Sequence, residues 1–148
     1  MTLRADNETS AEVFKSLAEL ERITVGEEGW SAESFRSEAA KENGIVLYIA
    51  DGGAVIALLT GYYAVGEGDI TNVAVLPAHR RRGLAQRLIT EFESLLPDDA
   101  EAVFLEVRES NAPAISLYKK CGFETLSARK NFYSNPRENA LVMRKLIL

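Results

Sequence analysis

Apolar positions along the chain follow two kinds of pattern, helical spacing in some segments and short continuous runs in others. Near the N-terminus, Phe14, Leu17 and Leu20 recur at helical spacing. Thr9 stands three residues before Glu12. This is a capping-box pattern, in which a hydroxyl and a carboxylate satisfy the first free backbone N–H groups of a helix. We therefore predict a first helix that begins at this pattern.

A second, weaker helix is expected to begin at Ser31 and to end at Gly44, with Phe35 facing inward. Beyond it, apolar runs bounded by turn-forming residues predict strands, and two segments with helical spacing interrupt them. The further predicted elements are strands at Ile45–Asp51, Ala54–Val65 and Ile70–Val75, a helix at Gly83–Leu96, a strand at Ala102–Arg108, a helix at Asn111–Lys120, and strands at Phe123–Lys130 and Ala140–Leu148.

The order of these elements predicts the fold class. A meander of strands precedes a strand–helix–strand crossover, which indicates an α/β fold with a mixed sheet covered by helices on both faces. We expect about six or seven mainly antiparallel strands and about four helices in such a fold. The turn-rich stretch Lys130–Asn139 is expected to join the last two strands.

Composition narrows the class of protein. The 148 residues suffice for one domain, expected to span residues 1–148. Apolar residues make up 47% and charged residues 26%, with a net charge of −5, which argues against binding to nucleic acid or to a membrane surface. One cysteine can form neither an internal disulfide nor a thiolate metal site. With a polar N-terminus and no apolar run of ~20 residues, these features predict a cytosolic, metal-free protein.

The segment "PAHRRRGLAQRLI", Pro77–Ile89, concentrates positive charge in front of a helix. The first N–H groups of a helix are unpaired and bind anions. Gly83 would let a phosphate approach the backbone, and the arginines would add charge-assisted hydrogen bonds. By itself, the basic run favours a solvated surface patch. Together with the preceding strand and the amphipathic helix, it favours a phosphate site.

Two quoted segments carry a family resemblance. "NVAVLPAHRRRGLAQRLI" resembles the acetyl-CoA-binding motif of the GNAT superfamily of N-acetyltransferases, Arg/Gln-x-x-Gly-x-Gly/Ala, here Arg80 to Ala85. "LEVRESNAPAISLYKKCGF" resembles the bacterial ribosomal-protein-alanine N-acetyltransferase family. The similarity covers Trp30 to the C-terminus and is strongest from Asn72 to Phe123. Alanine replaces the commoner glycine at position 85.

The resemblance implies a binding mode for acetyl-CoA. Backbone N–H groups of the basic loop would bind the pyrophosphate, and the pantetheine arm would lie along the preceding strand as an added strand. The implied cofactor-binding residues are Val73, Ala74, Val75, Arg80, Arg81, Arg82, Gly83, Leu84, Ala85 and Asn111. The family also suggests a backbone N–H of the strand, that of Val75, as oxyanion donor.

Glu106 is the candidate general base. A peptide α-amino group has a pKa of about 8, so it must lose a proton before it can attack at neutral pH. Alternation along the strand places Glu106 on the face opposite Leu105 and Val107. The alternative is a partly exposed carboxylate paired with Arg108 or another cation, and the family match favours the catalytic role.

Tyr118 is the candidate general acid for the leaving thiolate. Asn111 suits an N-cap and Pro113 the first helical turn, so the start of this helix is well specified. Tyr118 follows Asn111 by about two turns. A core tyrosine is the alternative, and the match to the family's tyrosine position favours the acid.

Aromatic residues on two segments are candidates for the acceptor site. By resemblance, Trp30, Phe35, Phe132 and Tyr133 would line the acceptor groove, although core packing explains Trp30 and Phe35 equally well. The resemblance thus implies an N-α-acetyltransferase that acts on a protein N-terminus, such as that of a ribosomal protein beginning with alanine. Acetylation of a small amine, an amino acid or a lysine side chain is an alternative. A non-catalytic acyl-CoA sensor is a second alternative, from a different class.

Overall fold

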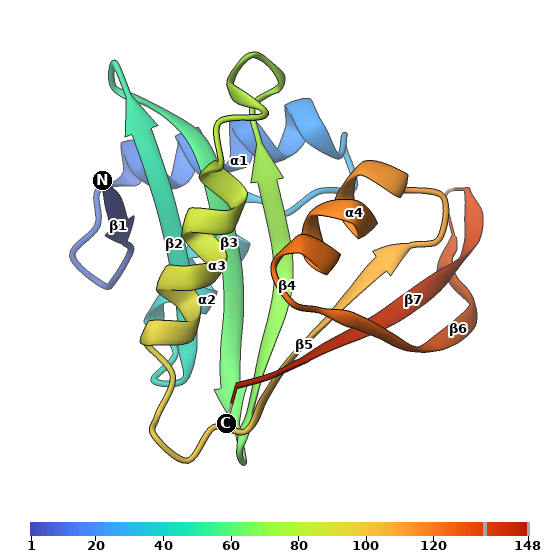
Figure 1. The fold of residues 1–148 in the computed structure, drawn as a ribbon. Helices are drawn as coiled ribbons and strands as arrows, with labels where there is room; N and C mark the ends of the chain where they lie inside the picture. The colour runs from blue at the N-terminus through green and yellow to red at the C-terminus, as the bar shows by residue number, and fades with distance from the viewer. Residues whose placement is uncertain (135, 148) are drawn as a thin grey trace.

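A computed structural model describes residues 1–134 and 136–147 of the chain. One mixed sheet of seven strands, in the order β1-β2-β3-β4-β5-β7-β6, forms its centre (Figure 1). The strands are β1 Thr2–Arg4, β2 Gly44–Asp51, β3 Ala54–Ala64, β4 Glu67–Val75, β5 Ala102–Arg108, β6 Glu124–Ser134 and β7 Arg137–Leu146. The helices are α1 Ala11–Thr24, α2 Ala32–Ala40, the 3₁₀ helix η1 Pro77–His79, α3 Leu84–Ser94 and α4 Ala112–Lys120.

Two hydrophobic cores lie on opposite faces of the sheet. In Figure 1, α3 and α4 lie in front of the sheet and α1 and α2 lie behind it. On the α1/α2 face, Phe14 and Phe35 pack against Val46 and Leu58 of the sheet. On the other face, the core includes Phe92 of α3. Strands β2 and β3 read as unbroken apolar runs because both of their faces are covered.

The predicted α/β fold class is confirmed, and local polar residues explain the helix starts. Ser31 and Asn111 cap α2 and α4, as predicted. The first helix is capped by Ser10, whose side chain accepts from Val13 N, rather than by Thr9. Thr9 instead accepts a hydrogen bond from the backbone N–H of Asp6 at 2.8 Å.

Gly44 has a different role from the predicted one. The second helix ends at Ala40, and Gly44 begins β2. A Cβ at position 44 would overlap the carbonyl oxygen of Glu38. Glycine is therefore required by the close approach of the strand to the end of α2, not by a left-handed turn.

Several element boundaries differ from the prediction. The short strand β1 was not predicted; it pairs with β2 from Thr2↔Ile49 to Arg4↔Leu47. Strand β4 begins at Glu67, three residues before the predicted start at Ile70. Strands β6 and β7 extend into the stretch expected to be a turn. Asn135 in that stretch, and Leu148 at the end of the last predicted strand, lie outside the described residues. No helix among the described residues is long and apolar enough to cross a membrane.

Candidate active site

Strands β4 and β5 separate in the middle of the sheet (Figure 1). Their parallel ladder runs only from Glu67↔Ala102 to Ile70↔Leu105. In the described part of the chain, β4 residues 72–75 therefore have a strand partner on one side only, in β3. Val73, Ala74 and Val75, the expected cofactor strand, lie on this open edge. An extended ligand could pair with the free backbone groups as an added strand does.

A β-bulge marks the point where the two strands part. Thr60 pairs with Asn72 and Gly61 with Ile70, so Thr71 is an extra residue in β4. Its hydroxyl lies 2.7 Å from that of Thr60. The bulge places Thr71 and Asn72 on the same face, where Thr71 lines a pocket and Asn72 contacts α1.

The basic loop follows directly after β4. Arg81 and Gly83 both have left-handed backbones, with φ of 66° and 75°. No side chain caps α3, so its first N–H groups lack a capping partner in the described chain. A Cβ on Gly83 would meet no atom within 4 Å, and the backbone therefore faces open space here. These features fit an anion at the start of α3.

The side chains of this loop are arranged around the open backbone. Arg80 Nε donates to Val75 O at 3.2 Å, and Arg82 Nη1 lies 3.3 Å from His79 Nδ1. Arg81 and Arg82 are exposed. Ala85 is buried and Leu84 packs against the core, so only the backbone of these two residues is offered to a ligand.

Glu106 extends from β5 on the α1/α2 face, as the alternation predicted. Its partner is Arg129 of β6, whose Nη1 lies 3.1 Å from Oε1 and 3.3 Å from Oε2. Arg108, the partner considered first from sequence, instead contacts Glu138 at 3.3 Å and lies over the Tyr133 ring. The ion pair with Arg129 fixes the position of the Glu106 carboxylate.

Tyr118 lies on the opposite side of the sheet, in the core that α3 and α4 cover. Its ring makes an edge contact with Phe123, with centroids 6.1 Å apart. Burial raises the pKa of Tyr118 to about 12, and Cys121 and Tyr133 add to the rise. Among the described residues no hydrogen bond to its hydroxyl is found, yet no fully buried polar side-chain atom lacks a partner. The ring is therefore packed while the hydroxyl is not completely buried.

Sequence reasoning missed a second polar pair beside Glu106. Tyr62 donates to Asp69 at 3.4 Å from the neighbouring strand. Burial raises the pKa of Asp69, and the charges of Glu106 and Glu67 raise it further. Asp69 lies before the predicted strand start at Ile70, so its place on a strand face beside Glu106 was not visible from the pattern.

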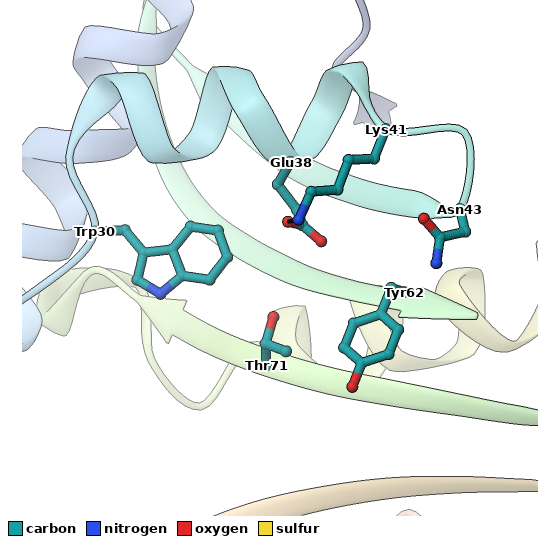
Figure 2. Close-up of a pocket in the computed structure, with 6 residues that line it drawn as sticks. All are labelled: Trp30, Glu38, Lys41, Asn43, Tyr62 and Thr71. Carbon is teal, nitrogen blue, oxygen red and sulfur yellow. Dashed lines mark hydrogen bonds and ion pairs between the residues drawn. The ribbon is translucent and has the colours of Figure 1, made fainter. Parts of the chain in front are cut away.

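The four aromatic candidates for the acceptor site lie in different surroundings. Phe35 has no exposed surface and belongs to the core, so the core interpretation holds for it. Trp30 packs on Phe35 with centroids 5.2 Å apart and lines a pocket of about 300 Å³. Figure 2 shows Glu38 and Lys41 on the helix side of this pocket, opposite Tyr62 and Thr71.

Phe132 and Tyr133 lie at the other side of the opening, near the end of β6. Their rings meet edge to face at 5.0 Å, and Phe132 is 44% exposed. Arg129 lies over the Phe132 ring, which connects this aromatic pair with the Glu106 ion pair. Asn111 caps α4 through Oδ1, which accepts from Ala114 N at 3.3 Å.

Comparison with known proteins identifies the family. Residues 10–123 match the model of the acetyltransferase (GNAT) family. The chain belongs to this family. It is an N-acetyltransferase, which excludes the non-catalytic sensor.

Two curated relatives are N-terminal acetyltransferases. The chain is 32% identical over 117 residues to the [ribosomal protein bS18]-alanine N-acetyltransferase of Escherichia coli K12, covering 77% of this chain and 78% of that protein. It is 37% identical over 84 residues to an N-alpha-acetyltransferase of Saccharolobus solfataricus, covering 55% and 50%.

Solved structures agree with this assignment. The crystal structure of the Escherichia coli ribosomal-protein-S18-alanine N-acetyltransferase superposes with a TM-score of 0.80 and 27% identity, covering 99% of this chain and 94% of that one. A GNAT acetyltransferase from Elizabethkingia anophelis with acetyl-CoA bound shares the fold, with a TM-score of 0.77, 14% identity and coverage of 99% and 97%.

Proposed function

We propose that this N-acetyltransferase transfers the acetyl group of acetyl-CoA to the α-amino group of a protein N-terminus, that of a ribosomal protein beginning with alanine. The separation of β4 and β5 is the observation that carries the proposal. Glu106 and Tyr118 lie on opposite faces of the sheet, and this gap is where both can reach one reaction centre. The named activities of the two relatives support the choice of acceptor.

The open edge of β4 and the basic loop fit acetyl-CoA, which supplies the activated acetyl group. Backbone groups of Val73 to Val75 would pair with the pantetheine arm, because no strand from the described residues pairs with them on that side. The N–H groups from Arg81 to Ala85 would hold the pyrophosphate at the start of α3. Arg80 and Arg82 would contribute positive charge, and Asn111 would contact the cofactor from the far side of the opening.

Glu106 serves as the base in this proposal. An acceptor amine of pKa about 8 is mostly protonated at neutral pH, and the Glu106 carboxylate removes that proton directly or through a water molecule. Arg129 of β6 pairs with this carboxylate at 3.1 Å. The amine then attacks in a complex that contains both substrates.

Tyr118 serves as the acid. A phenol of pKa about 12 is a weak proton donor to the thiolate of a thiol whose pKa is about 8.5. However, burial also raises the pKa of the neighbouring Cys121 thiol. A thiol of the cofactor in the same dry surroundings would be raised in the same way, which brings donor and acceptor closer.

A peptide panel tests the proposed acceptor. An alanine-first peptide with a free N-terminus, the same peptide with a blocked N-terminus and an internal lysine, and a free polyamine are each incubated with the protein and acetyl-CoA. Mass spectrometry should find one acetyl group, on the α-amine of the first peptide. Faster acetylation of the polyamine or the lysine would overturn the proposal in favour of a small-amine or lysine acceptor.

A further inference from the structure

A buried carboxylate outside the proposed catalytic pair joins the two sides of the site. Glu21, in the last turn of α1, is 2% exposed. Its Oε2 accepts from the Trp30 backbone N–H at 3.0 Å, and its Oε1 accepts from Asn72 Nδ2 at 2.7 Å. Among the described residues no cation pairs with it. Burying a carboxylate without a counter-ion is costly. The two hydrogen bonds from Trp30 and Asn72 offset part of this cost.

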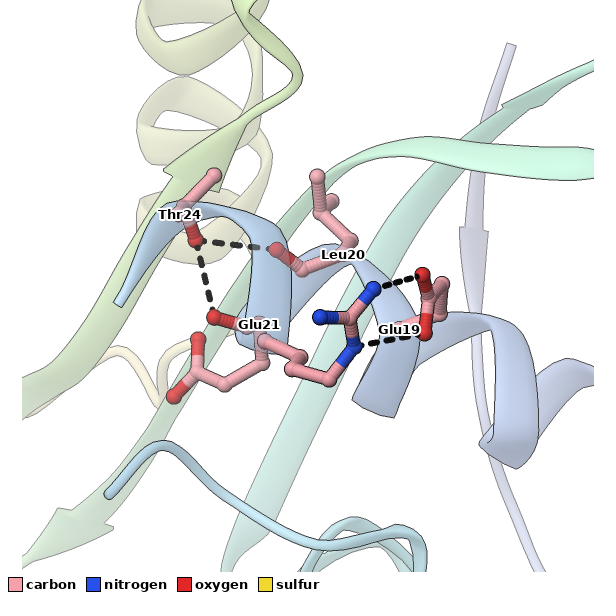
Figure 3. A network of polar contacts seen from close by, with 5 residues as sticks. Glu19, Leu20, Glu21 and Thr24 are labelled. Carbon is pink, nitrogen blue, oxygen red and sulfur yellow. Dashed lines mark hydrogen bonds and ion pairs between the residues drawn. The ribbon is translucent and has the colours of Figure 1, made fainter. Parts of the chain in front are cut away.

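The surrounding backbone is built around this side chain. Val25 N–H donates to the Glu21 carbonyl oxygen at 2.8 Å, which fixes the end of α1. A Cβ on Gly29 would overlap Glu21 Cγ, so glycine lets the loop pass against the carboxylate. Figure 3 shows that the carboxylates of Glu19 and Glu21 leave the helix in different directions, and that of Glu19 meets an exposed arginine.

The two donors belong to the two sides of the site. Trp30 precedes α2 and lines the pocket with Tyr62 and Thr71. Asn72 follows the bulge in β4 and immediately precedes Val73 on the open edge. Through Glu21, the loop at the proposed acceptor groove is therefore bonded to the strand at the proposed acetyl-CoA site.

We propose that Glu21 is a positioning residue that holds the Trp30 loop against β4 and so sets the width of the acceptor groove. This inference rests on the proposed function for the identity of the acceptor. Loss of the bonds should raise the KM for the acceptor peptide, while kcat at saturation and acetyl-CoA binding change little. The β3 ladder still holds the β4 edge in place.

Exchanging donor and acceptor tests the inference. Asn72→Asp places two carboxylates against each other, whereas Glu21→Gln with Asn72→Asp restores one donor and one acceptor in reversed order. The single variant should raise the acceptor KM by roughly 5–100-fold, as expected when a buried polar group loses its partner. The double variant should return to within about threefold of the parent. Glu19→Gln, the same change at an exposed site on the same helix, is the matched control and should have no effect.

Trp30 gives a readout that does not depend on activity, because it is the only tryptophan. Acrylamide should quench its fluorescence more strongly in Asn72→Asp than in the parent, because the loop is no longer held against β4. Quenching in the double variant should match the parent. If Asn72→Asp does not fold, Gly29→Ala, which pushes the loop from Glu21, should show the same increase.

The outcomes separate the two proposals. A parent-like acceptor KM and parent-like quenching in Asn72→Asp, or a double variant no better than the single one, would overturn the role of Glu21. A parent protein that acetylates no peptide N-terminus, with the quenching series as expected, would overturn the proposed acceptor and leave the hydrogen-bonded link intact.

Discussion

The two halves of the sheet contribute to the proposed site in different ways. On the β4 side, helices cover both faces and the groups directed at the opening are backbone N–H and C=O groups, from residues 71–75 and 81–85. On the β5–β7–β6 side, the α1/α2 face carries reactive and charged side chains, with Glu106, Arg108 and Arg129 in two ion pairs. One half should therefore tolerate changes of side chain that the other does not.

Tyr118→Phe should have the largest effect on activity, and it tests the half of the site in which side chains do the chemistry. The change keeps the packing against Phe123 and removes the proton assigned to the leaving thiolate. We expect kcat to fall by about 10²–10⁴-fold with acetyl-CoA affinity nearly unchanged. Steady-state kinetics and calorimetric titration check the two quantities, and an unchanged kcat would remove Tyr118 from the mechanism.

Glu106→Gln tests the same half through pH. We expect a loss of about 10²-fold near pH 7 that shrinks as pH rises past the amine pKa of about 8, because the acceptor then deprotonates unaided. A pH–rate profile measures this. Glu138→Gln, which disrupts the neighbouring ion pair with Arg108, is the control and should show no such recovery. A loss that is constant with pH would indicate positioning rather than proton transfer.

Gly83→Val should abolish the binding of acetyl-CoA by the half of the site that offers backbone groups. Acetyl-CoA at about 100 times its Kd should stabilise the parent protein by about 2.7 kcal/mol, a rise in Tm of roughly 5–10 °C. Valine disfavours the φ of 75° and fills the open space, so the rise should disappear. Arg82→Ala, which leaves the backbone intact, should retain most of it. If a thermal melt shows instead that Arg82→Ala loses the rise and Gly83→Val retains it, the arginine rather than the backbone dominates.

Asp69→Asn should have the smallest effect. It tests how burial of a carboxyl group changes the stability of the folded protein with pH. Because burial raises the pKa of Asp69 in the folded protein, the carboxyl contributes stability below its unfolded pKa, and this is lost as pH rises through the folded value. The variant should therefore be more stable than the parent at pH 7, by under about 1 kcal/mol because the group is half exposed. Urea unfolding between pH 4 and 8 measures the difference, which should fall on acidification.

Short-range patterns predicted most elements but missed features in both halves. The α4 cap at Asn111 and the bounds of β5 follow from local rules, and the structure agrees, whereas the early start of β4 and its bulge were not predicted. The pairing of Glu106 with Arg129 depends on the order β5-β7-β6, which brings together residues 23 positions apart. Strand β1 likewise depends on pairing with the distant strand β2, whereas the Tyr62–Asp69 pair depends on the register of the β3–β4 hairpin. Helical spacing places Glu21 on the face of Phe14 and Leu17, but its partners Trp30 and Asn72 depend on tertiary contacts that the local pattern does not reveal.

Because Thr71 is an extra residue, the alternation of side chains between the two faces of the sheet reverses at this point of β4. Below it, even-numbered Ile70 faces the α3 core; above it, odd-numbered Val73 and Val75 do so. A strict count of two through "ITNVAV" would bury Asn72 with Ile70 and misassign every later residue. Removing Thr71 would restore regular pairing and leave Asn72 facing Glu21, because Asn72 would then follow Ile70 directly. Losing one residue after the bulge would instead turn the residues beyond that point to the opposite faces, so the bulge is the one place in β4 where a deletion keeps the side chains on their present faces.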